Sequence, residues 1–166
     1  MTFEFPLDSS VFNLINFKEL SIMETDLVLQ MRNHPDIRRW MINDKTITKI
    51  EHIKFINSLS DKEFHFMVRD NKDEYIGIIN FKNIILNDSA DFGIYANPFS
   101  IAKYKGKNLL NLGIIFAKRI LKLNCISLFV FKHNTRAIEL YLRNGFVSTD
   151  RRTSLGEEFE EYKLML

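Results

Sequence analysis

The 166-residue sequence has few of the residues that cross-link or bend a chain: one cysteine, three prolines and six glycines. The single cysteine, Cys125, cannot form an internal disulfide, which is typical of proteins that stay in the reducing cytoplasm. Because Cys125 directly precedes an apolar run, we interpret it as a small core residue rather than a nucleophile. We therefore expect a cytoplasmic protein without disulfides.

Long apolar runs and a strong charge excess are also missing. No stretch reaches the roughly 18 continuous apolar residues of a membrane span. The N-terminus has no basic segment followed by an apolar one, so neither a signal peptide nor membrane association is expected. The formal net charge of +2 is too small to indicate nucleic-acid binding. His34, His52, His65 and His133 have no metal-ligand spacing, so we predict no metal site.

The chain does contain enough apolar material for a sizeable core, with 46% hydrophobic residues and 15 phenylalanines. Without linkers or repeats, we expect one domain over residues 1–166, with residues 1–12 as a loose lead-in. Strand and helix patterns mix along it, which predicts an α/β or α+β fold with a single sheet. Strands are expected over 14–17, 64–69, 75–81, 89–95 and 126–131, then from 146 and over 159–166. Helices are expected over 26–33, 36–42, 109–123 and 136–144, and after a capping box at Thr48 and Glu51.

A basic glycine turn, Lys103-Tyr104-Lys105-Gly106-Lys107-Asn108, precedes an apolar helix. Backbone N–H groups at a helix N-terminus can bind a pyrophosphate, and Gly106 allows a close approach. The surrounding lysines add positive charge. The turn therefore indicates a phosphate site, although a glycine before a helix is often only a turn.

A second segment runs from the strand 127–131 through Asn134 to Tyr141 and Gly145-Phe146. Tyr141 lies seven residues after Asn134, which is two helical turns, so both side chains can face the same way. A phenol placed there can act as a general acid. The alternative is a capping asparagine and a core tyrosine beside Phe146.

In this order, the two segments resemble the cofactor motifs of the GNAT superfamily of acyl-CoA N-acetyltransferases. The resemblance implies a mixed, mostly antiparallel sheet of about seven strands, splayed in the middle and flanked by helices. It also implies acetyl-CoA as cofactor, with Tyr141 as general acid and a backbone N–H at a bulge near residues 94–96 as oxyanion donor. Lys103 and Asn108 depart from the superfamily pattern, which has Gln or Arg and then Gly or Ala there. The implied cofactor contacts are Ile94, Tyr95, Ala96, Lys103, Lys105, Gly106, Lys107, Asn108, Leu109, Asn134, Ala137 and Tyr141.

The front half is similar to the N-acetyltransferases of bacterial pseudaminic acid synthesis, through residues 31–35, 40–41, 52–55, 77–80 and 93–98. That resemblance implies transfer to the 4-amino group of UDP-4-amino-4,6-dideoxy-N-acetyl-β-L-altrosamine. Asn80, or a water near it, would orient the amine and is the second catalytic candidate. Phe129 stands where family members can carry Glu, which suggests either direct attack by the neutral amine without a protein base or a different acceptor. The acceptor contacts are then Arg32, His52 and Lys82 for charged or uracil groups, and Trp40, Met41, Phe55 and Tyr95 for a deoxysugar methyl, beside Asn80.

Other interpretations stay open on the sequence alone. Arg32 can form an ordinary helix-face pair, and Trp40 and Phe55 can be core residues. The enzyme could instead be a ribosomal-protein N-terminal alanine or polyamine N-acetyltransferase, or a non-catalytic acyl-CoA-binding domain. An arginine-rich, aromatic front segment favours an anionic, partly apolar acceptor over a polyamine. An exposed sheet edge could also pair two copies into a homodimer.

Overall fold

The computed structural model describes residues 2–150, 156 and 158–166. In this part of the chain, eight strands form one sheet in the order β1-β2-β3-β4-β5-β6-β8-β7. The strands are β1 (Thr2–Leu7), β2 (Ser10–Asn16), β3 (Phe64–Asp70), β4 (Tyr75–Ile85), β5 (Ser89–Ala96), β6 (Cys125–Phe131), β7 (Val147–Ser148) and β8 (Phe159–Met165). The helices are α1 (Ile22–Asn33), α2 (Pro35–Arg38), α3 (Lys49–Ser58), α4 (Lys105–Arg119) and α5 (Thr135–Arg143), with a 3₁₀ turn at Phe17–Glu19.

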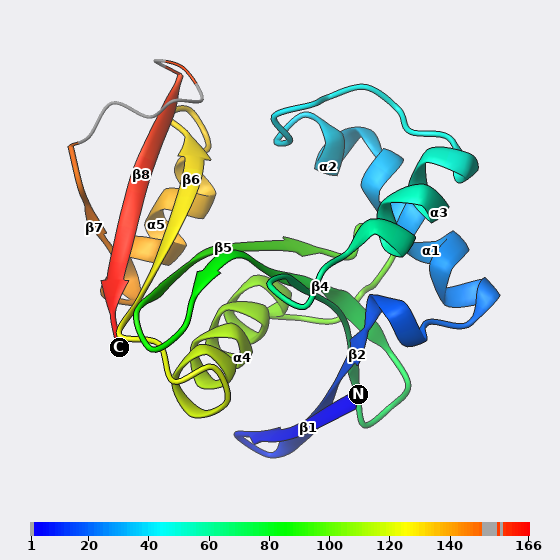
Figure 1. Cartoon of the computed structure of the whole chain (residues 1–166), viewed down its shortest axis with the longest axis horizontal. Coiled ribbons are helices and arrows are strands. Elements are labelled where there is room, and N and C mark those ends of the chain that lie inside the picture. Colours follow the sequence, from blue (N-terminus) through cyan, green and yellow to red (C-terminus); the bar gives the residue numbers. More distant parts are fainter. Residues whose placement is uncertain (1, 151–155, 157) are drawn as a thin grey trace.

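The sheet is antiparallel except at its middle, where β5 and β6 run parallel and are joined through α4. These two strands pair over only three positions, from Ser89 with Cys125 to Asp91 with Ser127. Beyond them β6 and β8 turn away from β5, and Figure 1 shows the gap that opens between the ribbons. The predicted mixed sheet, splayed in the middle and flanked by helices, is therefore confirmed, with eight strands in place of about seven.

The N-terminal residues differ from the expected loose lead-in over 1–12. From Thr2 onward they form an antiparallel hairpin, in which Phe5 lies opposite Phe12. Both rings are buried, and the neighbouring Phe3 contacts Phe116 of α4 at 5.0 Å between ring centroids. Apolar Phe3 and Phe5 alternate with exposed Thr2 and Glu4, which is the period of a strand with one buried face. This short alternation ties the start of the chain to the core.

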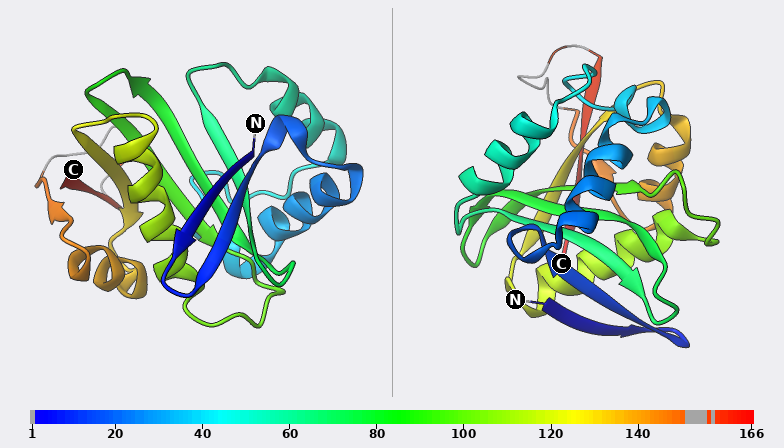
Figure 2. Two further views of the ribbon diagram at one scale, coloured as in Figure 1. Left: turned by 90° about the horizontal axis from the view of Figure 1, so that it is seen from below. Right: turned by 90° about the vertical axis from the view of Figure 1, so that its right-hand side faces the viewer.

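Different helices cover the two faces of the sheet, and each face has its own hydrophobic core. Figure 2 shows α4 on one face and α1, α2 and α3 on the other. The α4 face holds a phenylalanine-rich core in which Phe66 and Phe116 meet at 4.8 Å between ring centroids. The opposite face buries Val28 and Met31 of α1 against β3 and β4. The second face is less completely covered, and its free part becomes one side of the site.

Several helices begin before the predicted bounds. α1 begins at Ile22, behind a capping box of Ser21 and Glu24, and α4 begins at Lys105 rather than 109. The predicted capping box of Thr48 and Glu51 is confirmed at the start of α3. In the described parts of the chain, no helix has the length and apolarity to cross a membrane, and no cluster of side chains is suited to a metal ion.

Candidate active site

One cleft of about 1640 Å³ connects the gap between β5 and β6 with the partly covered sheet face beneath α1 and α3. All but two of the sequence-predicted site residues line it. The exceptions are Asn108, whose backbone N–H bonds to the Tyr104 carbonyl, and Leu109, which is fully buried. Leu109 lies under Gly77, where an added Cβ would come within 2.7 Å of its Cδ1 atom. The structure thus places both expected cofactor contacts outside the cleft, because they belong to the inner side of α4.

The open edge of β5 supplies backbone donors to the cleft. Asn97 N–H bonds to the Ile76 carbonyl of β4, so alternate residues of β5 also direct their N–H groups toward β4. The N–H groups of Ile94 and Ala96 therefore point the other way, into the gap left by β6. The expected bulge near 94–96 was wrong: the β4–β5 register is continuous there, and its irregularity lies between Lys82 and Ile85. The splay itself frees the donors.

The start of α4 supplies a second group of donors. Tyr104 precedes the helix with a φ of 58°, and the first intrahelical bond runs from Asn108 N–H to the Tyr104 carbonyl at 2.9 Å. The N–H groups of Lys105, Gly106 and Lys107 therefore have no acceptor within the helix. The first turn carries no carboxylate, and Gly106 lies against α5, where an added Cβ would be 3.4 Å from Leu140 Cδ2. This geometry suits a phosphate group.

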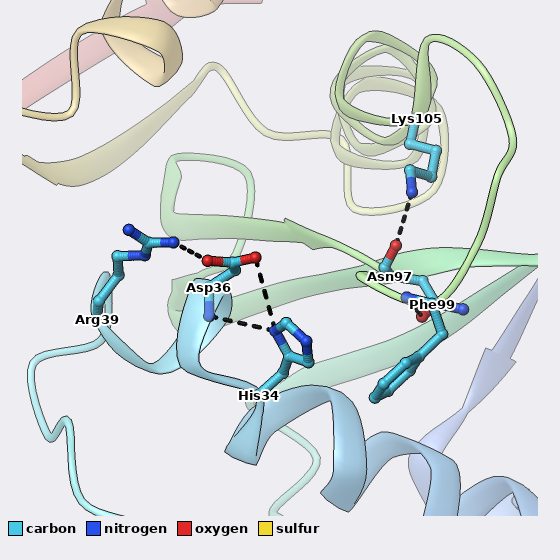
Figure 3. A network of polar contacts seen from close by, with 6 residues as sticks. All are labelled: His34, Asp36, Arg39, Asn97, Phe99 and Lys105. Carbon is cyan, nitrogen blue, oxygen red and sulfur yellow. Dashed lines mark hydrogen bonds and ion pairs between the residues drawn. The ribbon is translucent and has the colours of Figure 1, made fainter.

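The three lysines of this turn are not equivalent. Lys103 and Lys107 are exposed and line the cleft. Lys105 is half-buried, and its ammonium group donates to the backbone carbonyls of Asn97, at 2.7 Å, and of Ser100. Figure 3 shows the Lys105 side chain directed at Asn97. Desolvation accordingly lowers the pKa of Lys105.

Tyr141 lies on α5 at the wall of the cleft and is only 8% exposed. Its ring packs against Phe146, with 5.6 Å between centroids. Burial raises the pKa of Tyr141 to about 12, so the phenol keeps its proton at neutral pH. Asn134 accepts a hydrogen bond from Ala137 N–H and caps α5. The capping and core roles expected of these residues are thus present, and both side chains also line the cleft.

A polar wall faces the gap from α1, α3 and β3. Arg32 donates through Nη2 to the Asn43 carbonyl, whereas its Nη1 is buried without a partner among the described residues. His52 is 3% exposed, and its Nε2 is also buried without a partner among the described residues. Burial lowers the pKa of His52. His65, which the sequence did not single out, also lines the cleft with an unbonded, buried Nε2; the nearest acid is Glu63, at 3.6 Å. Burial and the nearby Lys82 lower the pKa of His65 to about 3.

The opposite wall is aromatic. Trp40 reaches across the gap to the end of β6, with its ring centroid 5.4 Å from that of His133 and 6.3 Å from that of Phe131. Phe129 lies next along this face of β6, is 38% exposed and lines the cleft with Phe159. Met41 also lines the cleft, whereas Phe55 of α3 lies on the polar side, with its ring centroid 5.2 Å from that of His65. The acceptor end of the cleft is therefore apolar on the β6 side and mixed on the α3 side, where polar groups lie beside one aromatic ring.

The floor between these walls comes from β4 and β5. The Asn80 amide lies over Gly93, where an added Cβ would be 2.9 Å from Asn80 Oδ1. Lys82 follows on the same face and is exposed. Tyr95 lies nearby, and enclosure of its phenol raises its pKa above the usual range while the charge of Arg32 opposes that shift.

Each carboxylate that lines the cleft already has a partner. Asp36 pairs with Arg39, Glu139 pairs with Arg143 at 3.5 Å, and Glu51 accepts from the Thr48 hydroxyl at 2.8 Å. The first of these pairs appears in Figure 3. The described cleft residues therefore offer cations, neutral imidazoles and a protonated phenol.

A family model described as an acetyltransferase (GNAT) domain matches residues 15–147. The chain belongs to the GNAT acetyltransferase family. It is 38% identical over 143 residues to acetyltransferase PseH from two strains of Campylobacter jejuni, covering 84% of this chain and 87% of that protein.

Solved structures agree with this membership. The crystal structure of the C. jejuni N-acetyltransferase PseH in complex with acetyl coenzyme A is similar with a TM-score of 0.74 and 31% identity, covering 93% of this chain and 98% of that one. A spermidine N-acetyltransferase from Vibrio cholerae, in complex with CoA and spermine, has a TM-score of 0.79 at 21% identity over 93% and 95% of the two chains, which shows the shared fold. The chain is thus an N-acetyltransferase that uses acetyl-CoA, and the donors on β5 and α4 fit that group.

Proposed function

We propose that this GNAT enzyme acetylates the 4-amino group of UDP-4-amino-4,6-dideoxy-N-acetyl-β-L-altrosamine in pseudaminic acid synthesis. The observation that carries the proposal is the polar wall, where Arg32 Nη1, His52 Nε2 and His65 Nε2 are buried without partners among the described residues. Buried polar groups are normally hydrogen-bonded, so these nitrogens favour a ligand rich in polar groups. The likeness to PseH supports the same acceptor.

The cleft suits both the charged and the apolar parts of such a molecule. Arg32 can pair with a diphosphate, and the exposed Lys82 adds charge on the same side. His52 and His65 are neutral at physiological pH and can bond to uncharged carbonyl or hydroxyl groups. Trp40, Met41, Phe55 and Tyr95, with Phe129, offer the apolar surface that a 6-deoxy sugar needs.

Acetyl-CoA supplies the acyl group as a thioester. The N–H groups of Gly106 and Lys107, with the Lys103 and Lys107 side chains, would hold its pyrophosphate, and Asn134 and Ala137 would line its arm. The N–H groups of Ile94 and Ala96 would bind the carbonyl oxygen as negative charge develops there.

The acceptor amine is oriented by Asn80 and attacks directly. Its proton passes to water, because every carboxylate lining the described cleft is engaged and Phe129 offers no base. Tyr141 gives its proton to the departing sulfur and recovers one from solvent. Cys125 is buried beside β8 and does not line the cleft, so no acyl-enzyme is expected.

A polyamine is a poorer fit to this cleft. A polycation binds best to free carboxylates, but the carboxylates lining the described cleft are paired with arginine or engaged in a helix cap. The cations Arg32, Lys82, Lys103 and Lys107 line the same space and would repel it. A peptide beginning with alanine is also a poorer fit, because it has no diphosphate to pair with Arg32. The proposal places the enzyme in the cytoplasm; the homodimer stays a prediction.

The test is release of CoA thiol from acetyl-CoA with a panel of amines. The panel holds UDP-4-amino-4,6-dideoxy sugars of the altro and related series, spermidine, and a peptide beginning with alanine. We expect release with the altro sugar nucleotide and little with the other two classes. Turnover of spermidine or the peptide, with the sugar nucleotides inactive, would overturn the assignment.

A further inference from the structure

We propose that Lys105 is a positioning residue, which clamps the loop between β5 and α4 and thereby fixes the first turn of α4 without itself binding the pyrophosphate. The inference concerns the acetyl-CoA half of the site. It therefore holds whichever amine the enzyme accepts.

The clamp joins the two ends of one loop. Lys105 is the first residue of α4, and Asn97 directly follows the last residue of β5. The Lys105 ammonium group donates to the Asn97 and Ser100 carbonyls (Figure 3). Two of its three donors are thus already engaged by the loop.

Both carbonyls belong to residues that are themselves fixed. Asn97 is 5% exposed and bonds through its backbone N–H to the Ile76 carbonyl and through Nδ2 to the Tyr75 carbonyl at 2.7 Å. Its Oδ1 accepts from Phe99 N–H. Ser100 is buried, and its hydroxyl oxygen accepts from Ala102 N–H. The clamp therefore ties α4 to a rigid segment of the sheet.

The helix start needs such support. Tyr104 has a φ of 58° and a ψ of 20°, a left-handed conformation that non-glycine residues adopt only when their surroundings impose it. Its side chain makes no capping bond. The turn at Tyr104 directs the N–H groups of Lys105, Gly106 and Lys107 outward. Lys105 directly follows this turn, and the bonds of its side chain to the loop hold the turn in place.

The clamp also sets the spacing between the two donor groups for acetyl-CoA. Ala96, with its N–H in the gap, is next to Asn97, which is bonded to β4. Losing the clamp would leave that end fixed and release the α4 end. The phosphate donors should then shift while the donors at the carbonyl stay in place, so affinity should fall more than the rate of the chemical step.

The first test compares Lys105→Met with Lys107→Met, an exposed lysine of the same turn. We expect Lys105→Met to weaken acetyl-CoA binding at least tenfold, with the salt dependence of the wild type and kcat within about twofold. Lys107→Met should instead make the salt dependence shallower, because a phosphate-facing charge is lost. Lys105→Arg, which keeps donors for both carbonyls, should restore most of the affinity.

An unchanged Kd in Lys105→Met, or a salt dependence as shallow as that of Lys107→Met, would overturn the proposal. Calorimetric Kd values need no acceptor, so a wrong acceptor assignment leaves this part of the test intact. kcat is measured with whichever amine the panel identifies.

A second measurement needs no variant. Limited labelling of the cofactor-free wild type with acetic anhydride should modify Lys103 and Lys107 at least tenfold faster than Lys105. An unclamped and accessible Lys105 would instead react about as fast as its neighbours. Equal or faster labelling of Lys105 would contradict the clamp.

Discussion

Burial acts in opposite directions on the two kinds of titratable group in this cleft. It raises the pKa of the Tyr141 phenol to about 12 and lowers the pKa of the His65 imidazole to about 3. Both groups are consequently neutral at physiological pH: the Tyr141 phenol keeps its proton, and the His65 imidazole does not gain a second one. The charged side chains of the cleft that have no carboxylate or capping partner are instead arginines and lysines, such as Arg32 and Lys82.

Replacing Tyr141 with phenylalanine tests its role as general acid. We expect kcat to fall about 100-fold or more, because the departing sulfur loses its proton donor. The Kd of acetyl-CoA should stay close to that of the wild type. The control is Tyr162→Phe: Tyr162 is also buried but bonds to Glu160 on β8, outside the cleft. A Tyr141→Phe enzyme with normal kcat would remove the general-acid assignment.

His65 should make the protein less stable in acid. The unfolded chain gains a proton on this side chain as the pH falls below about 6.5, whereas the folded protein does not until about pH 3. This group alone should therefore lower the free energy of unfolding by about 2 kcal/mol between pH 7.5 and pH 5. Urea unfolding at the two pH values should show a smaller loss in His65→Gln than in the wild type. An equal loss would mean that His65 is protonated in the folded state.

Single residues also mark the limit of what the sequence could predict for the site. Residue types and spacing sufficed for Tyr141, Asn134 and Gly106, which line one cleft as expected. His65 was missed because its place in an apolar strand is that of a core residue. The engagement of Lys105 with two carbonyls depends on the path of the loop, which no local pattern encodes. The acceptor residues come together only through packing of α1 and α3 on the sheet.

At the scale of elements, most strands were predictable and their ends were not. The strands around the splay are rich in apolar, β-branched and aromatic residues, which favour strands, so the sequence predicts them. The β1–β2 hairpin has only a few alternating residues and a proline at the sheet edge, which weakened the signal. The start of α4 was misplaced because Tyr104, a residue unsuited to a left-handed turn, ends the loop.

Replacing Phe5 with alanine tests whether the hairpin belongs to the core. Phe5 is 7% exposed and packs against Phe116, with 6.2 Å between ring centroids. We expect the free energy of unfolding to fall by about 3 kcal/mol or more, as for other buried phenylalanines. Glu4→Ala, on the exposed side of the same strand, should change it by less than about 0.5 kcal/mol. Equal stability of the two variants would support a loose lead-in after all.

At the scale of the whole molecule, Trp40 connects two parts that the sheet keeps apart. It leaves the α1–α3 side and contacts Phe131 and His133 at the end of β6. This contact lies at the end of β6, whereas the expected phosphate donors lie at the start of α4. In the proposed arrangement the two ligands occupy different ends of one cleft, so changes at one end should be separable from changes at the other.

Trp40→Ala should therefore affect the acceptor selectively. We expect the KM of the acceptor to rise roughly tenfold or more, because an apolar wall is lost, while the Kd of acetyl-CoA changes little. Trp40→Phe keeps a ring at this place and should retain most of the acceptor affinity. Steady-state kinetics and calorimetry measure the two quantities. A comparable loss of acetyl-CoA affinity in Trp40→Ala would show that the two ends are not independent.

The three-residue pairing of β5 with β6 has a mechanical consequence. In the middle of the sheet, β1–β5 and β6–β8 are joined by a seam of only three positions, and further along the amides of Ile94 and Ala96 face the gap. A bound acetyl-CoA that bonds to these amides on one side and contacts α5 on the other would link the two parts of the sheet across the gap. The cofactor should then slow amide hydrogen exchange on both sides of the gap together, so the two parts of the sheet become one cooperative unit when the enzyme is loaded.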